Sequence, residues 1–443
     1  MTTLLKHRLN VILSRRLGAN YAAYFDNVFW LASEKALQFL LSFLVGAYVA
    51  RFLGPDKYGV LGYTQSIVNI AAAVASLGID NIIVRQLVVE PAQRNEYLSA
   101  AALLRSGAGL LFLFLATIHW LMSASSDRSA LLVVIMMLSV PMNAISVLAL
   151  DLQAIVASKY VVFARTCQSL IGSTLRLSSA LLELSVVAFA WICTLETLLF
   201  NMLLVVFHGR ATRRVRLKFP QASTLKLLMR EGWPLLLSSV SVILYMRVDQ
   251  LMLKAMRGDF ETGVYIAAVR LTELLHFIPI ILCSSVYPSI VKAREVDRLK
   301  YAARTQLLCD GLYFVALALA LVFTSLARPM VQLLFGDAYL AAVPVLQVHI
   351  WSTIPVFLGI ASTQWLLAEA LQVVSLMITA TGLVANLLLN FFLIPAYGAL
   401  GAAFATAISY TLALFLGLLL TPRARPGLKI LLKAVCLHWA WHR

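Results

Sequence analysis

The chain has 443 residues, of which 61% are hydrophobic and 13% are charged, and its mean hydropathy is +0.87. This composition excludes a soluble globular protein, and apolar runs of about 20 residues recur along the chain, as in polytopic α-helical membrane proteins. The formal net charge of +16 would suggest nucleic acid as a partner. However, the basic residues lie in short segments between the apolar runs, which favours a role in topology and contact with anionic lipids. We therefore expect membrane lipids as partners and no nucleic acid.

The cysteines and histidines give no sign of a metal site. The five cysteines are isolated from one another and form no pair with a redox or zinc spacing: Cys167, Cys193, Cys283, Cys309 and Cys436. The seven histidines are scattered, and no nucleophile has a base close to it in the sequence. We expect no catalytic residues, no metal site and no cofactor.

The chain begins with a basic segment, residues 1–28, which we predict to be cytoplasmic. Residues 17–28 are mixed rather than apolar and no small-residue cleavage site follows, so the first span is expected to be retained. The hydrophobic pattern predicts an all-α protein with about 12 transmembrane helices. They are placed at 29–51, 58–80, 98–121, 130–150, 161–182, 185–207, 232–253, 264–290, 307–327, 338–360, 373–394 and 398–420.

Lys and Arg residues set the predicted orientation. The segments on the N-terminal side of the membrane hold 24 of them. Those on the other side hold 6, with Arg51 at the end of the first span counted there, and the remaining 6 lie within spans. Because basic residues concentrate in cytoplasmic loops, both termini are predicted to be cytoplasmic.

The longest inner connection divides the chain into two halves. Residues 208–231 form a basic cytoplasmic linker between an N-terminal six-helix lobe, 29–207, and a C-terminal six-helix lobe, 232–420. Residues 421–443 form a basic cytoplasmic tail whose Lys429, Lys433 and Trp439 suggest a helix at the inner membrane interface.

The two halves share a short pattern after their first spans. Gly54 and Gly59-Val60 have the same spacing in the first half as Gly258 and Gly263-Val264 have in the second. Six spans is an even number, so the repeats are expected to run in the same direction, related by an axis along the membrane normal.

Several motifs together resemble a known family. The first half carries Val45–Gly59 (VGAYVARFLGPDKYG) and Ser76–Asp80 (SLGID). The second half carries Trp233-Pro234, Arg247–Asp249, Gly263–Tyr265, Arg270–Glu273, Leu334–Tyr339 and Leu393–Gly398. This set resembles the polysaccharide flippases of the Wzx type, whose superfamily also includes the multidrug-extruding MATE transporters and the lipid II flippases.

The resemblance implies two six-helix lobes facing a central cavity. It implies a flippase that moves a polyprenyl-diphosphate-linked oligosaccharide from the cytoplasmic to the periplasmic leaflet of the bacterial inner membrane by alternating access. Such transport would serve the synthesis of O-antigen and lipopolysaccharide, capsule or exopolysaccharide. A glycan polymerase and a chain-length regulator of the same pathway are further partners that it implies.

A polar stripe runs along the fifth predicted span. Arg165 and Arg176 are eleven residues apart, roughly 16 Å along a helix, with Ser and Gln side chains at helical spacing between them. A stripe of this length suits a wet cavity, and arginine can bond two diphosphate oxygens at once. We therefore predict that both arginines bind the substrate.

Spans seven and eight carry charges of both signs. Arg247 and Asp249 point in different directions, while Arg270 and Glu273 share a helix face and could pair. We predict that Arg247 and Arg270 bind substrate in the central cavity. Asp249 or Glu273 would tune the positive electric field of these arginines or bind a coupling ion, Na⁺ or H⁺. Arg270 is a candidate partner for Asp249.

Two further charges complete the predicted site. Glu34 lies on a polar face of the first span, where we assign it to coupling or charge tuning. Arg105 in the third span has no acidic neighbour in its own span, so we predict that it faces the cavity.

Three alternatives compete with a flippase. A MATE-type multidrug or cation antiporter shares the organisation, but six bases within the spans and few acids favour an anionic cargo. A membrane glycan polymerase or ligase would need a long external loop, whereas the external loops here have roughly ten residues or fewer. A major facilitator transporter would need more basic residues between spans two and three than Arg85 and Arg94.

Overall fold

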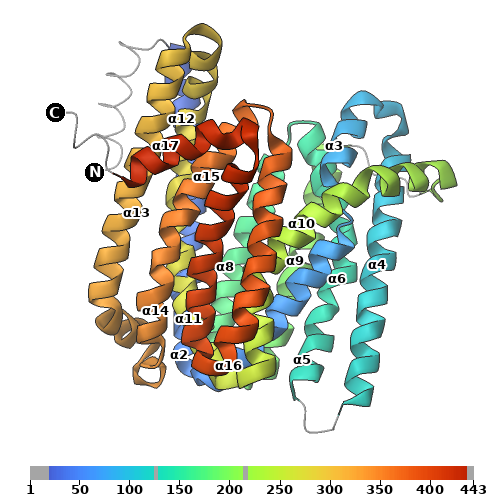
Figure 1. The fold of residues 1–443 in the computed structure, drawn as a ribbon. Helices are drawn as coiled ribbons and strands as arrows, with labels where there is room; N and C mark the ends of the chain where they lie inside the picture. Colours follow the sequence, from blue (N-terminus) through green and yellow to red (C-terminus); the bar gives the residue numbers. More distant parts are fainter. Residues whose placement is uncertain (1–18, 124–127, 213–217, 437–443) are drawn as a thin grey trace.

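The computed structural model describes residues 19–123, 128–212 and 218–436, with the backbone alone at 19–40, 128 and 288. All regular structure in these residues is helical (Figure 1). The N-terminal half contains α2 (Ala19–Ala75), α3 (Asp80–Val89), η1 (Pro91–Gln93), α4 (Arg94–Met122), α5 (Arg128–Met137), α6 (Ser139–Met142), η2 (Asn143–Ser146), α7 (Val147–Ala154), α8 (Lys159–Leu181) and α9 (Val186–Ala211).

The C-terminal half is built in the same way. It contains α10 (Ala222–Arg257), α11 (Asp259–Leu275), α12 (Phe277–Val296), α13 (Arg298–Phe335), η3 (Asp337–Tyr339), α14 (Ala342–His349), η4 (Ile350–Ser352), α15 (Thr353–Ala368), α16 (Gln372–Leu420), η5 (Pro422–Ala424) and α17 (Arg425–Val435). In Figure 1, α3 to α6 lie on the right and α12 to α15 on the left, with α2, α8 and α11 between them.

The helices account for the twelve predicted spans. Nine helical stretches of the described residues are long and apolar enough to cross a membrane, and two of them, Leu41–Val89 and Gln372–Leu420, have 49 residues each. Each of these two contains a pair of spans joined at a kink. The twelfth span is α8, whose polar stripe lowers its hydropathy. The predicted fold class, an all-α membrane protein of two six-helix lobes, is confirmed.

Glycines at the turns make the paired spans possible. Gly54, with φ 72°, interrupts α2, and Gly398, with φ 58°, interrupts α16. A left-handed residue there reverses the chain without a Cβ clash. In α16 the Asn386 amide donates to the Ser409 hydroxyl at 3.3 Å, so its two limbs lie side by side.

The two shared glycine patterns pack against each other. A Cβ on Gly59 would meet the backbone of Asp259 and Gly263, and a Cβ on Gly263 would meet the backbone of Pro55. The contact is reciprocal, as expected of elements related by a two-fold axis. The glycines therefore allow α2 of one half and α11 of the other to approach backbone to backbone.

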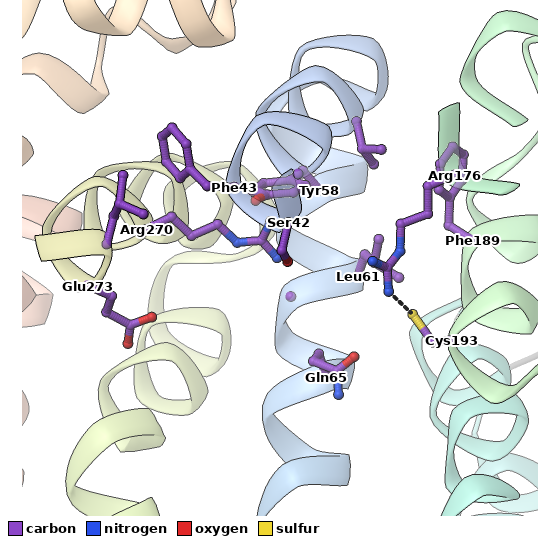
Figure 2. A pocket seen from close by; sticks show the side chains of 14 residues that line it. Ser42, Phe43, Tyr58, Leu61, Gln65, Arg176, Phe189, Cys193, Arg270 and Glu273 are labelled. Carbon is purple, nitrogen blue, oxygen red and sulfur yellow. Dashed lines mark hydrogen bonds between the residues drawn. The ribbon is translucent and has the colours of Figure 1, made fainter. Parts of the chain in front are cut away.

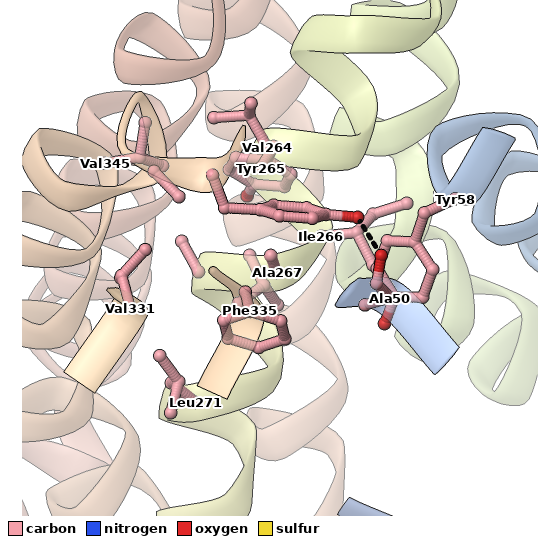
Figure 3. Packing of buried hydrophobic residues seen from close by; sticks show 14 of the residues in the cluster. Ala50, Tyr58, Val264, Tyr265, Ile266, Ala267, Leu271, Val331, Phe335 and Val345 are labelled. Carbon is pink, nitrogen blue, oxygen red and sulfur yellow. Dashed lines mark hydrogen bonds between the residues drawn. The ribbon is translucent and has the colours of Figure 1, made fainter. Parts of the chain in front are cut away.

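The largest cluster of buried apolar side chains joins the two halves at this end of the molecule. Figure 3 shows Val264 to Ala267 of α11 packed with Val331, Phe335 and Val345. The buried Tyr339 hydroxyl donates to the Ala50 carbonyl oxygen of α2 at 2.9 Å.

At the opposite end, the turn between α15 and α16 is held by charge. Glu369 accepts from Nε and Nη2 of Arg294, at 3.2 Å each, and lies 3.6 Å from Nη1 of Arg298. Burial raises the pKa of Glu369, but the hydrogen bonds and charge of Arg294 outweigh it and lower that pKa overall.

The linker and tail differ in detail from the prediction. Helix α9 continues to Ala211 and α10 begins at Ala222, so both ends of the predicted linker 208–231 are helical. In the tail, α17 buries Leu431 and Ala434 against the C-terminal half and leaves Lys429 and Lys433 exposed. Trp439 lies outside the described residues.

Candidate functional site

A cavity of about 330 Å³ lies between the two limbs of α2 and the helices α8, α9 and α11 (Figure 2). Because α2 belongs to the N-terminal half and α11 to the C-terminal half, the cavity is at the junction of the lobes. The side chains around it are both charged and neutral. They include Ser42, Phe43, Tyr58, Leu61, Gln65, Arg176, Phe189, Cys193, Arg270 and Glu273.

Arg176 enters the cavity from α8 and is paired. Its Nη2 lies 2.5 Å from Oε2 of Glu196 on α9 and 4.0 Å from Sγ of Cys193. The other carboxylate oxygen of Glu196 is buried without a hydrogen-bond partner among the described residues. Gly172 gives Glu196 its room, because a Cβ there would collide with that carboxylate.

Arg270 reaches the cavity from α11 and lies across α2. Its guanidinium carbon is 5.1 Å from the centroid of the Tyr58 ring, a distance typical of a cation–π contact. The absence of a Cβ on Gly46 allows the guanidinium to pass over α2. Among side chains from residue 41 onward that the structure describes, Arg270 has no carboxylate within ion-pair distance.

Glu273 connects the cavity to Arg247. The carboxylate of Glu273, on the cavity wall, lies 3.2 Å from Nη1 of Arg247 on α10. The expected pair of Arg270 and Glu273 within one helix is thus replaced by a pair between two helices. Among the described side chains, the three arginines and the two glutamates paired with them carry a formal charge of +1, which Arg270 supplies.

Asp249 lies apart from this cavity in a buried polar network. It accepts hydrogen bonds from the Tyr265 hydroxyl and, at 2.7 Å, from the backbone N–H of Gln250. The Tyr265 hydroxyl also lies 3.2 Å from Oγ1 of Thr406 on α16. The partner that we considered for Asp249, Arg270, contacts Tyr58 instead.

The network continues in both directions. The Ser66 hydroxyl of α2 donates to Oε1 of Gln250 at 2.6 Å, so the network bridges the halves. On α16 the Asn390 amide donates to Oδ1 of Asn386 at 2.8 Å, and the Asn390 carbonyl oxygen is buried without a partner among the described residues.

Two predicted substrate-binding arginines fall elsewhere. Arg105 is 6% exposed and pairs with Asp80 of α3, while its Nη1 donates to the Ser146 hydroxyl at 3.3 Å, outside the cavity lining. Arg165 is exposed, with its guanidinium 5.2 Å from the Phe200 ring centroid. The structure thus does not place either arginine in the cavity. The Glu34 side chain lies outside the described side chains.

Sequence reasoning missed Glu196 and Tyr58. Glu196 is the single charged residue between 185 and 207, and an isolated acid in a membrane span is a signal for a functional or paired site. Tyr58 lies within the Gly54–Gly59 motif, but nothing local indicates that Arg270 stacks on it.

Solved transporter structures share this fold. A MATE-family multidrug resistance transporter in its inward-facing conformation matches with a TM-score of 0.70 and 16% identity, over 89% of this chain and 96% of that one. The lipid II flippase MurJ in its inward closed conformation matches with a TM-score of 0.71 and 13% identity, over 93% of this chain and 92% of that one. A MOP-superfamily transporter from Pyrococcus furiosus matches with a TM-score of 0.62 and 16% identity, over 91% of this chain and 96% of that one. At these identities the likeness establishes the fold, that of a multi-pass membrane protein.

Sequence comparison gives one curated relative and one family. The relative, "Probable flippase AglR" of Haloferax volcanii, is 29% identical over 203 residues, which are 44% of this chain and 41% of that protein. The chain thus matches about two fifths of this relative's length. The model of the family described as "Polysaccharide biosynthesis protein" matches residues 24–294, more than half of the chain. The chain therefore belongs to the polysaccharide biosynthesis protein family.

Proposed function

We propose that this protein is a flippase that moves a polyprenyl-diphosphate-linked oligosaccharide from the cytoplasmic to the periplasmic leaflet of a bacterial inner membrane. The observation that carries the proposal is the cavity between the lobes, where Arg176 and Arg270 face the same space. The product would enter O-antigen, lipopolysaccharide, capsule or exopolysaccharide synthesis, together with a glycan polymerase and a chain-length regulator.

The chemistry of the two arginines suits a diphosphate. A guanidinium presents several N–H donors in one plane and can bond two phosphate oxygens at once. Arg270 is free to do so because a ring, not a carboxylate, supports it. Arg176 would have to share its donors with Glu196. Ser42 and Gln65 can bond the sugar nearest the diphosphate.

The polyprenyl tail does not need to enter the cavity. It is as apolar as the surrounding lipid, so it could remain in the bilayer while the diphosphate crosses between the lobes. Moving two negative charges outward across a potential of about 100 mV, negative inside, would release roughly 4–5 kcal/mol. Export of the anion is then downhill, and returning the empty cationic cavity is the step that needs assistance.

For that return step we propose a coupling ion, Na⁺ or H⁺, bound at Asp249. A carboxylate that is 4% exposed inside a membrane is costly unless it is neutralised. Thr406 and the unpartnered carbonyl oxygen of Asn390 add oxygen atoms to the same network. Asp249→Asn would then abolish the dependence of transport on the ion gradient.

The relatives agree with this proposal at a coarser level. The family description refers to polysaccharide biosynthesis, and the curated relative carries the word flippase in its name. Non-enzymatic transport, cytoplasmic termini and the inner membrane complete the proposal.

Reconstitution of the purified protein in liposomes tests the proposed flippase activity. Purified protein is placed in liposomes with a lipid-linked oligosaccharide in one leaflet, and a sugar-cleaving enzyme is added on the other side. We expect protein-dependent exposure of the sugar with the lipid linkage intact. Efflux of small organic cations without sugar exposure would favour a MATE-type antiporter, and chain growth or transfer of the glycan would favour a polymerase or ligase.

A further inference from the structure

A second cavity of about 810 Å³ lies within the N-terminal half, between α4, α9 and the segment formed by η2 and α7. It is separate from the cavity between the lobes. The two cavities share only α9, where Cys193 faces one and Val205 the other, twelve residues or roughly 18 Å apart along the helix. We call this second cavity the α4–α9 groove.

The basic side chains of the groove lie at one end. His208 and Arg210, in the last turns of α9, line that end. His208 is 3% exposed and its Nε2 lies 2.6 Å from Oδ2 of Asp151 and 3.2 Å from Nη2 of Arg94. Arg94 begins α4, so this end of the groove lies where the helices leave the membrane.

The carboxylate at this end, that of Asp151, is already neutralised by an ion pair with Arg94. Asp151 is 1% exposed and accepts from Nε and Nη2 of Arg94 at 2.7 Å and 2.5 Å. A buried carboxylate bonded in this way presents little negative field to the groove. Arg210 is exposed, and its positive charge dominates the polar end.

Apart from Ser106 at its far end, the rest of the groove is lined by apolar side chains and is open to the side. Leu98 and Ala102 of α4 form one wall. Ile145, Val205 and Val206 line it as well, with 40%, 49% and 50% of their surface exposed. From Leu98 to Ser106 the groove follows α4 for eight residues, roughly 12 Å into the membrane.

This order of groups matches an amphipathic lipid. A basic group lies at the membrane surface and an apolar channel descends from it, as in sites between transmembrane helices that bind anionic headgroups. We propose that the α4–α9 groove binds an anionic glycerophospholipid of the leaflet next to the basic loops. The guanidinium of Arg210 bonds its phosphate, and one acyl chain lies between α4 and α9.

Charge decides between anionic and neutral lipids. The groove lining contains Arg210 and His208 and no carboxylate among the described residues. The last turn of α9 also directs carbonyl groups toward this end, which disfavours an anion on the helix axis. The phosphate is therefore placed beside Arg210 rather than beyond the end of the helix.

Native mass spectrometry of the purified full-length protein can test the proposal. The probes are phosphatidylglycerol, phosphatidylcholine and a polyprenyl phosphate. We expect Arg210→Gln to weaken phosphatidylglycerol binding about fivefold, the effect of one basic residue near an anionic surface, and to leave phosphatidylcholine binding unchanged. Arg230→Gln is the matched control, because Arg230 is an exposed arginine on α10 at the same end of the molecule.

A second variant tests the acyl chain site. Ala102→Phe places a ring in the groove and should remove the tightly bound phosphatidylglycerol while Arg210 is intact. Equal binding of both phospholipids to the wild type, or an equal loss in Arg230→Gln, would overturn the proposal. Displacement of phosphatidylglycerol by the polyprenyl phosphate would overturn the choice of a phospholipid. Lipid binding is measured without transport, so these outcomes are independent of the proposed function.

Discussion

Three arginines at the junction of the lobes differ in what holds them. Arg176 has Glu196, Arg247 has Glu273, and Arg270 has the face of Tyr58. A cation–π contact supports an arginine without occupying its N–H donors, whereas a carboxylate occupies at least one of them. Arg270 is therefore the residue best prepared to bind an anionic substrate.

The first prediction concerns Arg270. Arg270→Gln should lower the rate of sugar exposure in liposomes tenfold or more, since a hydrogen bond to a charged group contributes about 1.5–3 kcal/mol. Arg270→Lys should recover part of the rate, because lysine keeps the charge and loses the planar fork. Exposed Arg328 on α13 provides the control, Arg328→Gln, with an expected rate like that of the wild type. A wild-type rate in Arg270→Gln would remove Arg270 from the substrate site.

The second prediction separates a structural from a functional role for Arg176. Removing one partner of a buried ion pair typically costs about 3–5 kcal/mol, and a smaller loss is expected here because the Arg176 side chain is 27% exposed. Arg176→Gln and Glu196→Gln should both lower the thermal unfolding temperature in detergent. The charge swap Arg176→Glu with Glu196→Arg should restore that temperature but not transport. If the swap restores both, the pair is only structural.

At the scale of elements, glycine decides where the long helices turn and how closely they approach. Gly54 and Gly398 reverse α2 and α16, while Gly59 and Gly263 permit the reciprocal contact of α2 with α11. The same residue type thus performs two tasks, one through its backbone angles and one through its missing side chain.

The third prediction tests the close approach. Gly263→Ala forces a Cβ against the backbone of Pro55 and should destabilise the protein by about 1–3 kcal/mol, as overpacking does. Gly107→Ala in α4 meets nothing within 4 Å and should be neutral or slightly stabilising. Thermal unfolding of both variants measures the difference, and equal behaviour would mean that α2 and α11 can separate without cost.

The fourth prediction concerns pH and the turn between α15 and α16. The folded state lowers the pKa of Glu369 below its ordinary value of 4.5. Glu369 therefore contributes stability that is fully present above pH 4.5 and is lost as the pH falls through its lowered pKa. Glu369→Gln should destabilise the protein by about 1 kcal/mol or less at pH 7, since the site is partly solvated. The difference between variant and wild type should shrink below pH 4.5, and a constant difference would assign the effect to something other than charge.

At the scale of the whole molecule, two lobes of six helices meet around one cationic cavity. The turns at Gly54, Gly258, Gly336 and Gly398 have positive φ. Several close contacts between the halves occur there, including the hydrogen bond from Tyr339 to Ala50. The basic connections lie at the other end, and the Lys and Arg distribution predicts that this end is cytoplasmic.

The fifth prediction is the topology. The background is Cys436→Ser, because Cys436 is exposed whereas the other four cysteines are partly or fully buried. A cysteine introduced at Asp56 or at Asp337 should react with an impermeant thiol reagent added outside intact cells. A cysteine at Lys226 should react only after the cells are opened. The reverse pattern would invert the proposed orientation and, with it, the direction of export.

The sequence by itself determined the number and position of the spans. Membrane insertion depends on the hydrophobicity of each segment, which is a local property. The limits of α8, Lys159–Leu181, differ by two residues or fewer from the predicted 161–182. The turns at Gly54 and Gly258 were also readable, because a left-handed backbone selects glycine locally.

Only the tertiary structure decided which charges meet. The pairs Arg105 with Asp80, Arg176 with Glu196 and Arg247 with Glu273 each join two helices. Their partners depend on the rotation and crossing of those helices, which small residues such as Gly46 and Gly172 set through packing with distant segments. Helical spacing shows that Arg165 and Arg176 share a stripe, but the packing of α2, α9 and α11 places only Arg176 in the cavity.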